Sequence, residues 1–301
     1  MPELPEVETI RRGLAPRILG RRIVKAELRL AKLVRGCAPG TFARAIEGRR
    51  FEAVDRRAKY LLFRLSGART WMVHLGMSGQ LGFWDHRLPE DPRFSISPLT
   101  GLQRSQGQHP ADRHTHLLLH LEGGDRVQYR DIRQFGHFRL VGTGEESSLA
   151  SLRRLGLEPL DGGFTYQAFE AALKGRRGMV KALLLNQTAV VGLGNIYSDE
   201  ACFAAGIHPR RRVESLGPER RRALYAAIKA VLDQALDSGG TTLRDYRRAD
   251  GTHGLNQDRL QAYGREGEPC LRCGSVLRKT TVAQRTTVFC PRCQKQEAKR
   301  P

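Results

Sequence analysis

Residues 270–293 read CLRCGSVLRKTTVAQRTTVFCPRC, two CxxC motifs separated by sixteen residues. Each motif presents two thiolates to one tetrahedral ion, and the residues between the motifs are enough for a β-hairpin that returns the chain. Two disulfides or a redox CxxC are the alternatives, but nothing in the sequence indicates an oxidising compartment. We therefore predict one structural Zn²⁺ with no open coordination position, so not a catalytic metal. Its ligands would be Cys270, Cys273, Cys290 and Cys293.

The chain before this zinc ribbon has a helical pattern. From about residue 148, apolar residues recur at helical spacing, and arginine runs lie at the edges of the segments. The pattern predicts a helical domain over 148–262, followed by the zinc ribbon over 263–301. The predicted helices lie within 148–160, 166–177, 179–187, 195–206 and 218–240.

The N-terminal half, residues 1–141, begins with a helix and continues as strands. Apolar residues from Val7 to Ile18 step by three and four, which predicts a helix that ends near 16–20. Beyond it the pattern has period two, which predicts an antiparallel sandwich or barrel and makes the protein α+β and multidomain. The predicted strands cover 23–30, 59–65, 70–77, 116–129 and 135–141. A long exposed loop is expected at 87–113 and a linker at 142–147.

The charge of the chain points to a polyanionic partner. Fifty-one Lys and Arg against thirty-one Asp and Glu leave a net charge of +20 over 301 residues. Each phosphate that such a surface neutralises releases condensed counterions, which favours binding of nucleic acid. A merely soluble basic protein is the alternative. No secretory signal and no apolar stretch near the ~18 residues of a membrane span is present, so we expect a cytoplasmic protein that does not bind membranes.

The first residues, MPELPEVE, suggest a nucleophile. Removal of Met1 would expose the α-amine of Pro2, a secondary amine that forms a persistently charged iminium with an aldehyde-level carbon. Such an iminium is the electron sink that elimination chemistry requires. Glu3 and Glu6 lie beside it and can divide the acid and base roles. The alternative is that Glu6 merely favours the N-terminus of a helix.

The chain resembles the bacterial formamidopyrimidine-DNA glycosylases over nearly its whole length. The matching segments are MPELPEVETIRRGL, RRAKYLL, HLGMSG, DIRQFG, GLGNIYSDE, GTTLRDY, QAYGREGEPC and the four-cysteine finger with AQR. The resemblance implies a β-sandwich flanked by two helices, a helix-two-turn-helix domain and a zinc finger. It also implies a monomeric DNA glycosylase and AP lyase that removes 8-oxoguanine and formamidopyrimidines and cleaves the strand by β,δ-elimination. Its partner would be double-stranded DNA with an oxidised base or an abasic site.

The resemblance also implies roles for single residues of the catalytic motifs. Pro2 resembles the Schiff-base nucleophile that attacks C1′, and Glu3 resembles the proton donor. Glu6 resembles a supporting carboxylate beside them. Lys59 of RRAKYLL is similar to a strand-borne lysine that contacts phosphate and assists catalysis.

Further residues resemble the DNA contacts of the family. Asn195 of GLGNIY and Arg285 of the zinc hairpin resemble the pair that grips the phosphates around the flipped nucleotide. His74 resembles a phosphate contact. Lys181 lies in the segment that borders the damaged base.

A flipped base leaves a gap in the duplex, and three residues resemble those that fill it. Phe135 resembles the wedge, Arg133 the partner of the orphaned cytosine, and Met77 the third intercalating residue. Without the resemblance, Met77 and Phe135 would be assigned to a core.

Two other functions remain open. The endonuclease VIII type, which excises oxidised pyrimidines, shares the nucleophile, the lysine and the zinc finger, although ELPEVE and RQF favour the purine branch. A zinc-ribbon DNA-binding protein without catalysis is the third possibility. The loop 87–113 is longer than the family usually has there, and 247–258 matches the base-capping loop only in position, which leaves the lesion preference open.

Overall fold

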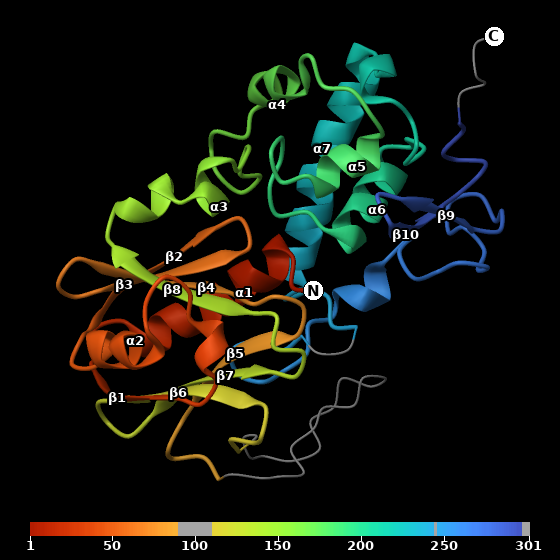
Figure 1. Ribbon diagram of the computed structural model, residues 1–301. Helices are drawn as coiled ribbons and strands as arrows, with labels where there is room; N and C mark the ends of the chain where they lie inside the picture. Colours follow the sequence, from red (N-terminus) through yellow and green to blue (C-terminus); the bar gives the residue numbers. More distant parts are fainter. Residues whose placement is uncertain (90–109, 244–245, 297–301) are drawn as a thin grey trace. The chain divides into compact units, whose positions relative to one another are not determined.

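The computed structural model describes residues 1–89, 110–243 and 246–296, and its chain divides into two compact units (Figure 1). The first unit contains Met1–Arg153 and Leu236–Gln257, and the second contains Arg154–Ala235 and Asp258–Pro301. Most of the loop predicted at 87–113 lies outside the described residues. In the parts of the chain that the structure describes, no helix is long and apolar enough to cross a membrane.

The first unit contains two antiparallel four-stranded sheets that share one core. Buried side chains of both sheets join a single apolar cluster, with Trp71 and Phe138 from one sheet and Leu117 and Tyr129 from the other. The predicted sandwich is therefore confirmed. One sheet has the order β1 (Ile23–Leu28), β6 (Thr115–Leu121), β7 (Arg126–Asp131) and β5 (Gly79–Trp84), and the other the order β2 (Phe51–Arg57), β3 (Tyr60–Leu65), β4 (Arg69–His74) and β8 (His137–Gly142).

Helices complete this core. The helix α1 (Leu4–Ile18) buries Val7, Ile10 and Leu14 completely, which confirms the predicted helix. Pro5 suits the first turn because its missing N–H would have no partner there. The shorter α2 (Pro39–Ile46) buries two more apolar residues, Phe42 and Ile46, and η1 (Ala31–Leu33) precedes it.

Sequence reasoning missed β2, β5 and α2. In β2 the buried residues are Phe51 and Val54, a spacing of three, because the pairing register with β3 shifts between Phe51 and Ala53. In β5, GQLGFW, two glycines interrupt the apolar pattern. A bulge and glycines remove the period-two signal on which the prediction of strands depends.

The second unit is mostly helical before its C-terminal hairpin, and residues 236–257, which the prediction included in the helical domain 148–262, belong to the first unit. Its core includes Leu184, Tyr197, Leu224 and Ile228. The helices are α4 (Tyr166–Leu173), α5 (Val180–Leu185), α6 (Asn195–Ala204) and α7 (Pro218–Asp237), the last of which continues into the first unit, and η3 (Val213–Ser215) precedes α7. The strands β9 (Arg278–Val282) and β10 (Arg285–Phe289) form the predicted antiparallel hairpin, and η4 (Asn256–Arg259) leads toward it.

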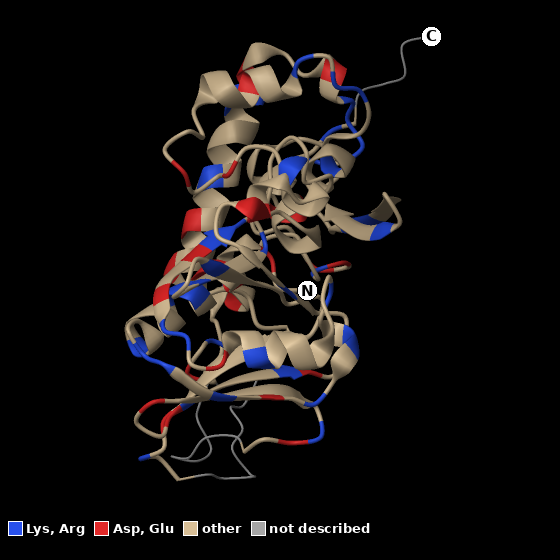
Figure 2. Cartoon of the chain, turned by 60° about the vertical axis from the view of Figure 1, so that its left-hand side comes forward, with Lys and Arg blue, Asp and Glu red and all other residues tan. Residues whose placement is uncertain are grey.

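The segment predicted as a linker, 142–147, contains part of η2 (Glu145–Ser148), which α3 (Ala150–Arg153) follows. Its Glu146 is buried and forms an ion pair with Arg64 of β3. Lys and Arg, blue in Figure 2, lie on helices, strands and loops of both units, with Asp and Glu among them. The positive charge of the chain is therefore not confined to a tail.

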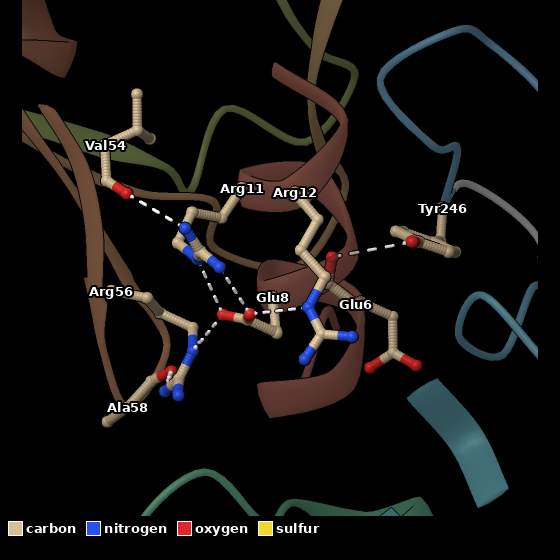
Figure 3. Close-up of polar contacts among 8 residues, drawn as sticks. All are labelled: Glu6, Glu8, Arg11, Arg12, Val54, Arg56, Ala58 and Tyr246. Carbon is tan, nitrogen blue, oxygen red and sulfur yellow. Dashed lines mark hydrogen bonds and ion pairs between the residues drawn. The ribbon is translucent and has the colours of Figure 1, made fainter. Parts of the chain in front are cut away.

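An ion-pair cluster around the buried Glu8 joins α1 to β2 (Figure 3). The carboxylate of Glu8 accepts hydrogen bonds from Arg11 at 2.8 Å, Arg12 at 2.8 Å and Arg56 at 3.0 Å. Arg11 also donates to the carbonyl of Val54 in β2. Burial by itself raises the pKa of Glu8, but the hydrogen bonds from the three arginines lower it to about 2.

The lowered pKa of Glu8 predicts a pH-dependent contribution to stability. Because the folded pKa lies below the ordinary 4.5, the contribution is complete above that value and is lost as the pH falls toward 2. We expect Glu8→Gln to lower the free energy of unfolding at pH 7 by roughly 2 kcal/mol and to lower it much less near pH 3. Urea unfolding followed by circular dichroism checks this.

The control is Glu122→Gln, which removes an exposed carboxylate paired with Arg50. It should change stability little at either pH, because exposed ion pairs contribute little. An equal loss at both pH values in Glu8→Gln would contradict the role assigned to its charge.

Candidate active site and zinc centre

The N-terminus of α1 carries a buried pair of carboxylates. Pro2 is buried, and Glu3 and Glu6 are 2% and 1% exposed. One carboxylate oxygen of Glu6 accepts the backbone N–H of Glu3 at 2.8 Å, and the other accepts the N–H of Thr241 at 2.8 Å. Glu6 thus caps the N-terminus of α1 and also holds the segment around Thr241.

The segment around Thr241 closes over this carboxylate. Gly240 has a φ of 85°, and a Cβ there would lie 3.1 Å from Oε1 of Glu6 and 2.9 Å from the ring of Tyr246. The hydroxyl of Tyr246 donates to the carbonyl of Gly239 at 3.1 Å, and burial raises its pKa. The hydroxyl therefore stays protonated and holds the segment in place.

Lys59 lies near the two carboxylates. It was expected on a strand, but it lies with Ala58 in the two-residue turn between β2 and β3, where Ala58 has a φ of 52°. Lys59 is 7% exposed. Burial lowers its pKa, and the charges of Glu3 and Glu6 act in the opposite direction. The structure thus brings Glu3, Glu6 and Lys59 together beside Pro2.

His74 ends β4 and is neutral. Its ring stacks on His137 with centroids 5.1 Å apart and packs against Tyr60 at 4.8 Å. Burial, with His137, Lys59 and other positive charges nearby, lowers its pKa to about 3. Because Nδ1 accepts the N–H of Gly76, the ring proton lies on Nε2, so a phosphate contact would use a neutral donor.

The three residues expected to fill the gap in the duplex lie on two loops. Phe135 is 54% exposed, so it does not belong to the core, and Met77 is half-buried. The guanidinium of Arg133 lies 5.0 Å from the centroid of the Phe135 ring. The aromatic and cationic groups of this loop therefore stand together at the surface.

Within the second unit, Asn195 contacts the strand that begins with Arg285. Asn195 begins α6 and donates to the carbonyl of Thr286 at 3.0 Å. Arg285 is exposed at the start of β10, after a two-residue turn in which Ala283 and Gln284 have φ of 48° and 59°. The first residues of β10 are thus held against α6.

The structure corrects the expectation that Lys181 contacts DNA. Its side chain is 0% exposed and forms an ion pair of 2.7 Å with Asp199 of α6. It also donates to Thr287 at 2.8 Å and to the carbonyl of Thr286 at 3.2 Å. A buried ammonium needs such partners. Lys181 therefore lies beneath the hairpin and connects β10 to α5 and α6.

The four cysteines of the finger form a metal centre. Their sulfur atoms all lie within 4.8 Å of one another, with 3.5 Å between Cys273 and Cys290 and 3.9 Å between Cys270 and Cys293. A tetrahedral Zn²⁺ with bonds of ~2.3 Å requires sulfur separations of about 3.8 Å. The residues therefore fit one structural Zn²⁺, and four thiolates leave no position for a substrate.

Sequence reasoning missed the part that Gly240, Thr241 and Tyr246 play in this site. The signal was present, because GTTLRDY is one of the segments that carry the family resemblance and contains Thr241. What the sequence lacked was the pairing of Thr241 with Glu6, which lies 235 residues away. Arg56, which joins Glu8 to the carbonyl of Ala58 before Lys59, was missed as well.

Family models and relatives match the whole of this arrangement. The model of the formamidopyrimidine-DNA glycosylase N-terminal domain matches residues 1–138, and that of the H2TH domain of the same family matches 155–247. A zinc finger found in FPG and IleRS matches 267–296. These matches confirm the predicted fold class, with the zinc finger at its C-terminal end.

Individual relatives agree with the family models. A formamidopyrimidine-DNA glycosylase of Symbiobacterium thermophilum is 46% identical over 98% of this chain and 89% of its own length. Two Lactococcus lactis structures, a mutant FPG with Fapy-dG DNA and the Fpg protein with abasic-site DNA, have TM-scores of 0.85 and 0.84 at 32% identity. Each of these two comparisons covers 98% of this chain and 100% of the other. The chain belongs to the formamidopyrimidine-DNA glycosylase family.

Proposed function

We propose that this protein excises oxidised purines from double-stranded DNA and then cleaves the strand, with the amine of Pro2 as its nucleophile. The observation that carries the proposal is the buried cluster of Glu3, Glu6 and Lys59 beside Pro2. Family membership makes the chain a DNA glycosylase with AP lyase activity in base excision repair. The proposal adds which residues of this chain do the chemistry.

The reaction follows from an amine beside a proton donor. Once Met1 is removed, the nitrogen of Pro2 attacks C1′ and the base leaves with the electrons of the glycosidic bond. The nitrogen of Pro2 loses its proton to the departing base, and Glu3 donates a proton to the ring oxygen as the sugar opens to the iminium. The iminium then takes up the electrons released when a proton leaves C2′, which eliminates the 3′ phosphate, and loss of a proton from C4′ eliminates the 5′ phosphate; the ionised carboxylate of Glu3 accepts these protons. The carboxylate of Glu6 accepts the backbone N–H of Glu3, so Glu6 acts by positioning Glu3. Lys59 supplies a positive charge toward phosphate.

Several groups contact the DNA in this proposal. Arg285 and Asn195 contact the phosphates around the flipped nucleotide, and the exposure of Arg285 supports this role. Met77, Arg133 and Phe135 fill the vacated space, with Arg133 on the orphaned cytosine. Because the relatives named above are bacterial, we place this activity in the bacterial cytoplasm on nucleoid DNA.

Borohydride reduction of the iminium tests two things at once: whether Pro2 is the nucleophile, and whether the protein prefers an oxidised purine or an oxidised pyrimidine. The purified chain, shown by mass spectrometry to lack Met1, is mixed with a duplex that carries 8-oxoguanine opposite cytosine or with one that carries an oxidised pyrimidine. We expect a covalent adduct at Pro2 with the first duplex, because reduction traps the iminium. We expect Pro2→Gly and Glu3→Gln to lower strand cleavage about a hundredfold or more.

The control for these variants is Glu122→Gln, an exposed carboxylate outside the site, which should cleave at the normal rate. Duplex binding should persist in all variants. Cleavage retained in both Pro2→Gly and Glu3→Gln would refute the assignment. An adduct that prefers the oxidised pyrimidine would place the protein in the endonuclease VIII type, and binding without any adduct would leave a DNA-binding protein.

Removal of zinc tests the role of the finger. We expect a chelator, or Cys273→Ser, to unfold the β9–β10 hairpin and to weaken duplex binding about tenfold, because Arg285 loses its support. Metal analysis and fluorescence anisotropy measure both effects. Cys37→Ser, outside the finger, is the matched control and should keep zinc and affinity. Unchanged affinity of the zinc-free protein would contradict this role.

A further inference from the structure

A buried carboxylate lies beneath the loops that carry the three wedge residues. Asp131 ends β7 and is 0% exposed. Its two oxygens accept from the hydroxyl of Ser78 at 2.6 Å and from that of Tyr129 at 3.0 Å. They also accept the backbone N–H of Arg133 at 3.2 Å and that of Gly136 at 2.9 Å. Four donors therefore meet at one side chain that the proposed chemistry does not use.

Three of these donors belong to the two loops of the wedge, and the fourth, the hydroxyl of Tyr129, lies on β7. Ser78 directly follows Met77, and Gly136 directly follows Phe135. The hydroxyl of Ser78 also accepts the N–H of Arg133 at 3.0 Å. The carboxylate and this hydroxyl thus connect every backbone segment from which a wedge side chain projects.

The two loops pack too closely to shift past each other. A Cβ at Gly76 would lie 2.5 Å from the backbone nitrogen of Gly136, and a Cβ at Gly136 would lie 1.7 Å from the hydroxyl of Tyr129. Burial and the charge of Asp131 raise the pKa of Tyr129, so its hydroxyl remains a donor. Gln134, between Arg133 and Phe135, has a φ of 58°. The conformation is thus specified by contacts rather than by the preference of the chain.

We propose that Asp131 is a positioning residue that holds Met77, Arg133 and Phe135 ready for insertion before DNA binds. The inference rests on the proposed function, since the wedge role belongs to it. An exposed phenyl ring enters a base stack efficiently only when its backbone is already fixed, because ordering it during insertion would cost free energy. Asp131 meets this requirement without touching DNA.

The test separates insertion from chemistry with two substrates. One is a duplex with 8-oxoguanine opposite cytosine and 2-aminopurine beside the lesion, whose fluorescence reports unstacking. The other is a single-stranded oligonucleotide with an abasic site, which has no orphaned base and no gap to fill. We expect Asp131→Asn to slow unstacking and excision on the duplex about tenfold or more. Cleavage of the single strand should stay within about twofold of the normal rate.

Asp125→Asn is the matched control. Asp125 is also buried, with 3% of its surface exposed. It directly precedes β7, whereas Asp131 is the last residue of that strand. Asp125 accepts from His86 and forms an ion pair with Arg21, away from the wedge loops. This variant should change both rates equally or not at all.

Ser78→Ala and Tyr129→Phe each remove one hydroxyl that donates to Asp131. If Asp131→Asn does not fold, these two variants take its place in the test. Both should show a smaller loss on the duplex alone. Duplex rates unchanged in all three variants, or equal losses on both substrates, would overturn the positioning role. Failure of the unaltered protein to act on either substrate would instead refute the proposed function and this inference with it.

Discussion

Two backbone N–H groups, those of Glu3 and Thr241, meet at the carboxylate of Glu6, and the candidate active site of the first unit depends on this interaction. A carboxylate that is 1% exposed is stable only with donors at both oxygens. The helix N-terminus and the segment around Gly240 supply those donors, so neither can move without leaving a buried acceptor unmatched. The same constraint fixes the backbone of Glu3 beside Pro2.

Periodicity and spacing predicted much of the fold because those signals are local. The apolar face of α1, the strands around Trp71 and the helices of the second unit all follow from repeats of three to four residues or of two. The zinc centre follows from cysteine spacing alone. The strands β2 and β5 were missed because a register shift and two glycines disturb the alternation, although both strands are needed to complete the sheets.

The site was predicted from motifs, and its errors concern partners distant in sequence. Lys181 was expected to border the damaged base, but it is buried and its partners Asp199 and Thr287 come from later parts of the chain, the latter 106 residues away. Asp131 likewise looked like one residue of a strand end, and only the return of Ser78 to it reveals a shared support. Local patterns identify which residues carry chemistry, whereas the pairing that holds them requires the folded chain.

The left-handed turns have a consequence for how this protein can evolve. Among the residues that the structure describes, non-glycine positions with positive φ include Ala58 before Lys59, Gln134 beside Phe135, and the Ala283–Gln284 turn before Arg285. Each costs roughly 1 kcal/mol relative to glycine. Glycine would remove that cost but would also loosen the side chain that the turn presents. Selection for heat resistance and selection for rapid repair therefore act in opposite directions at the same few positions, and gains in thermostability should accumulate elsewhere in the chain.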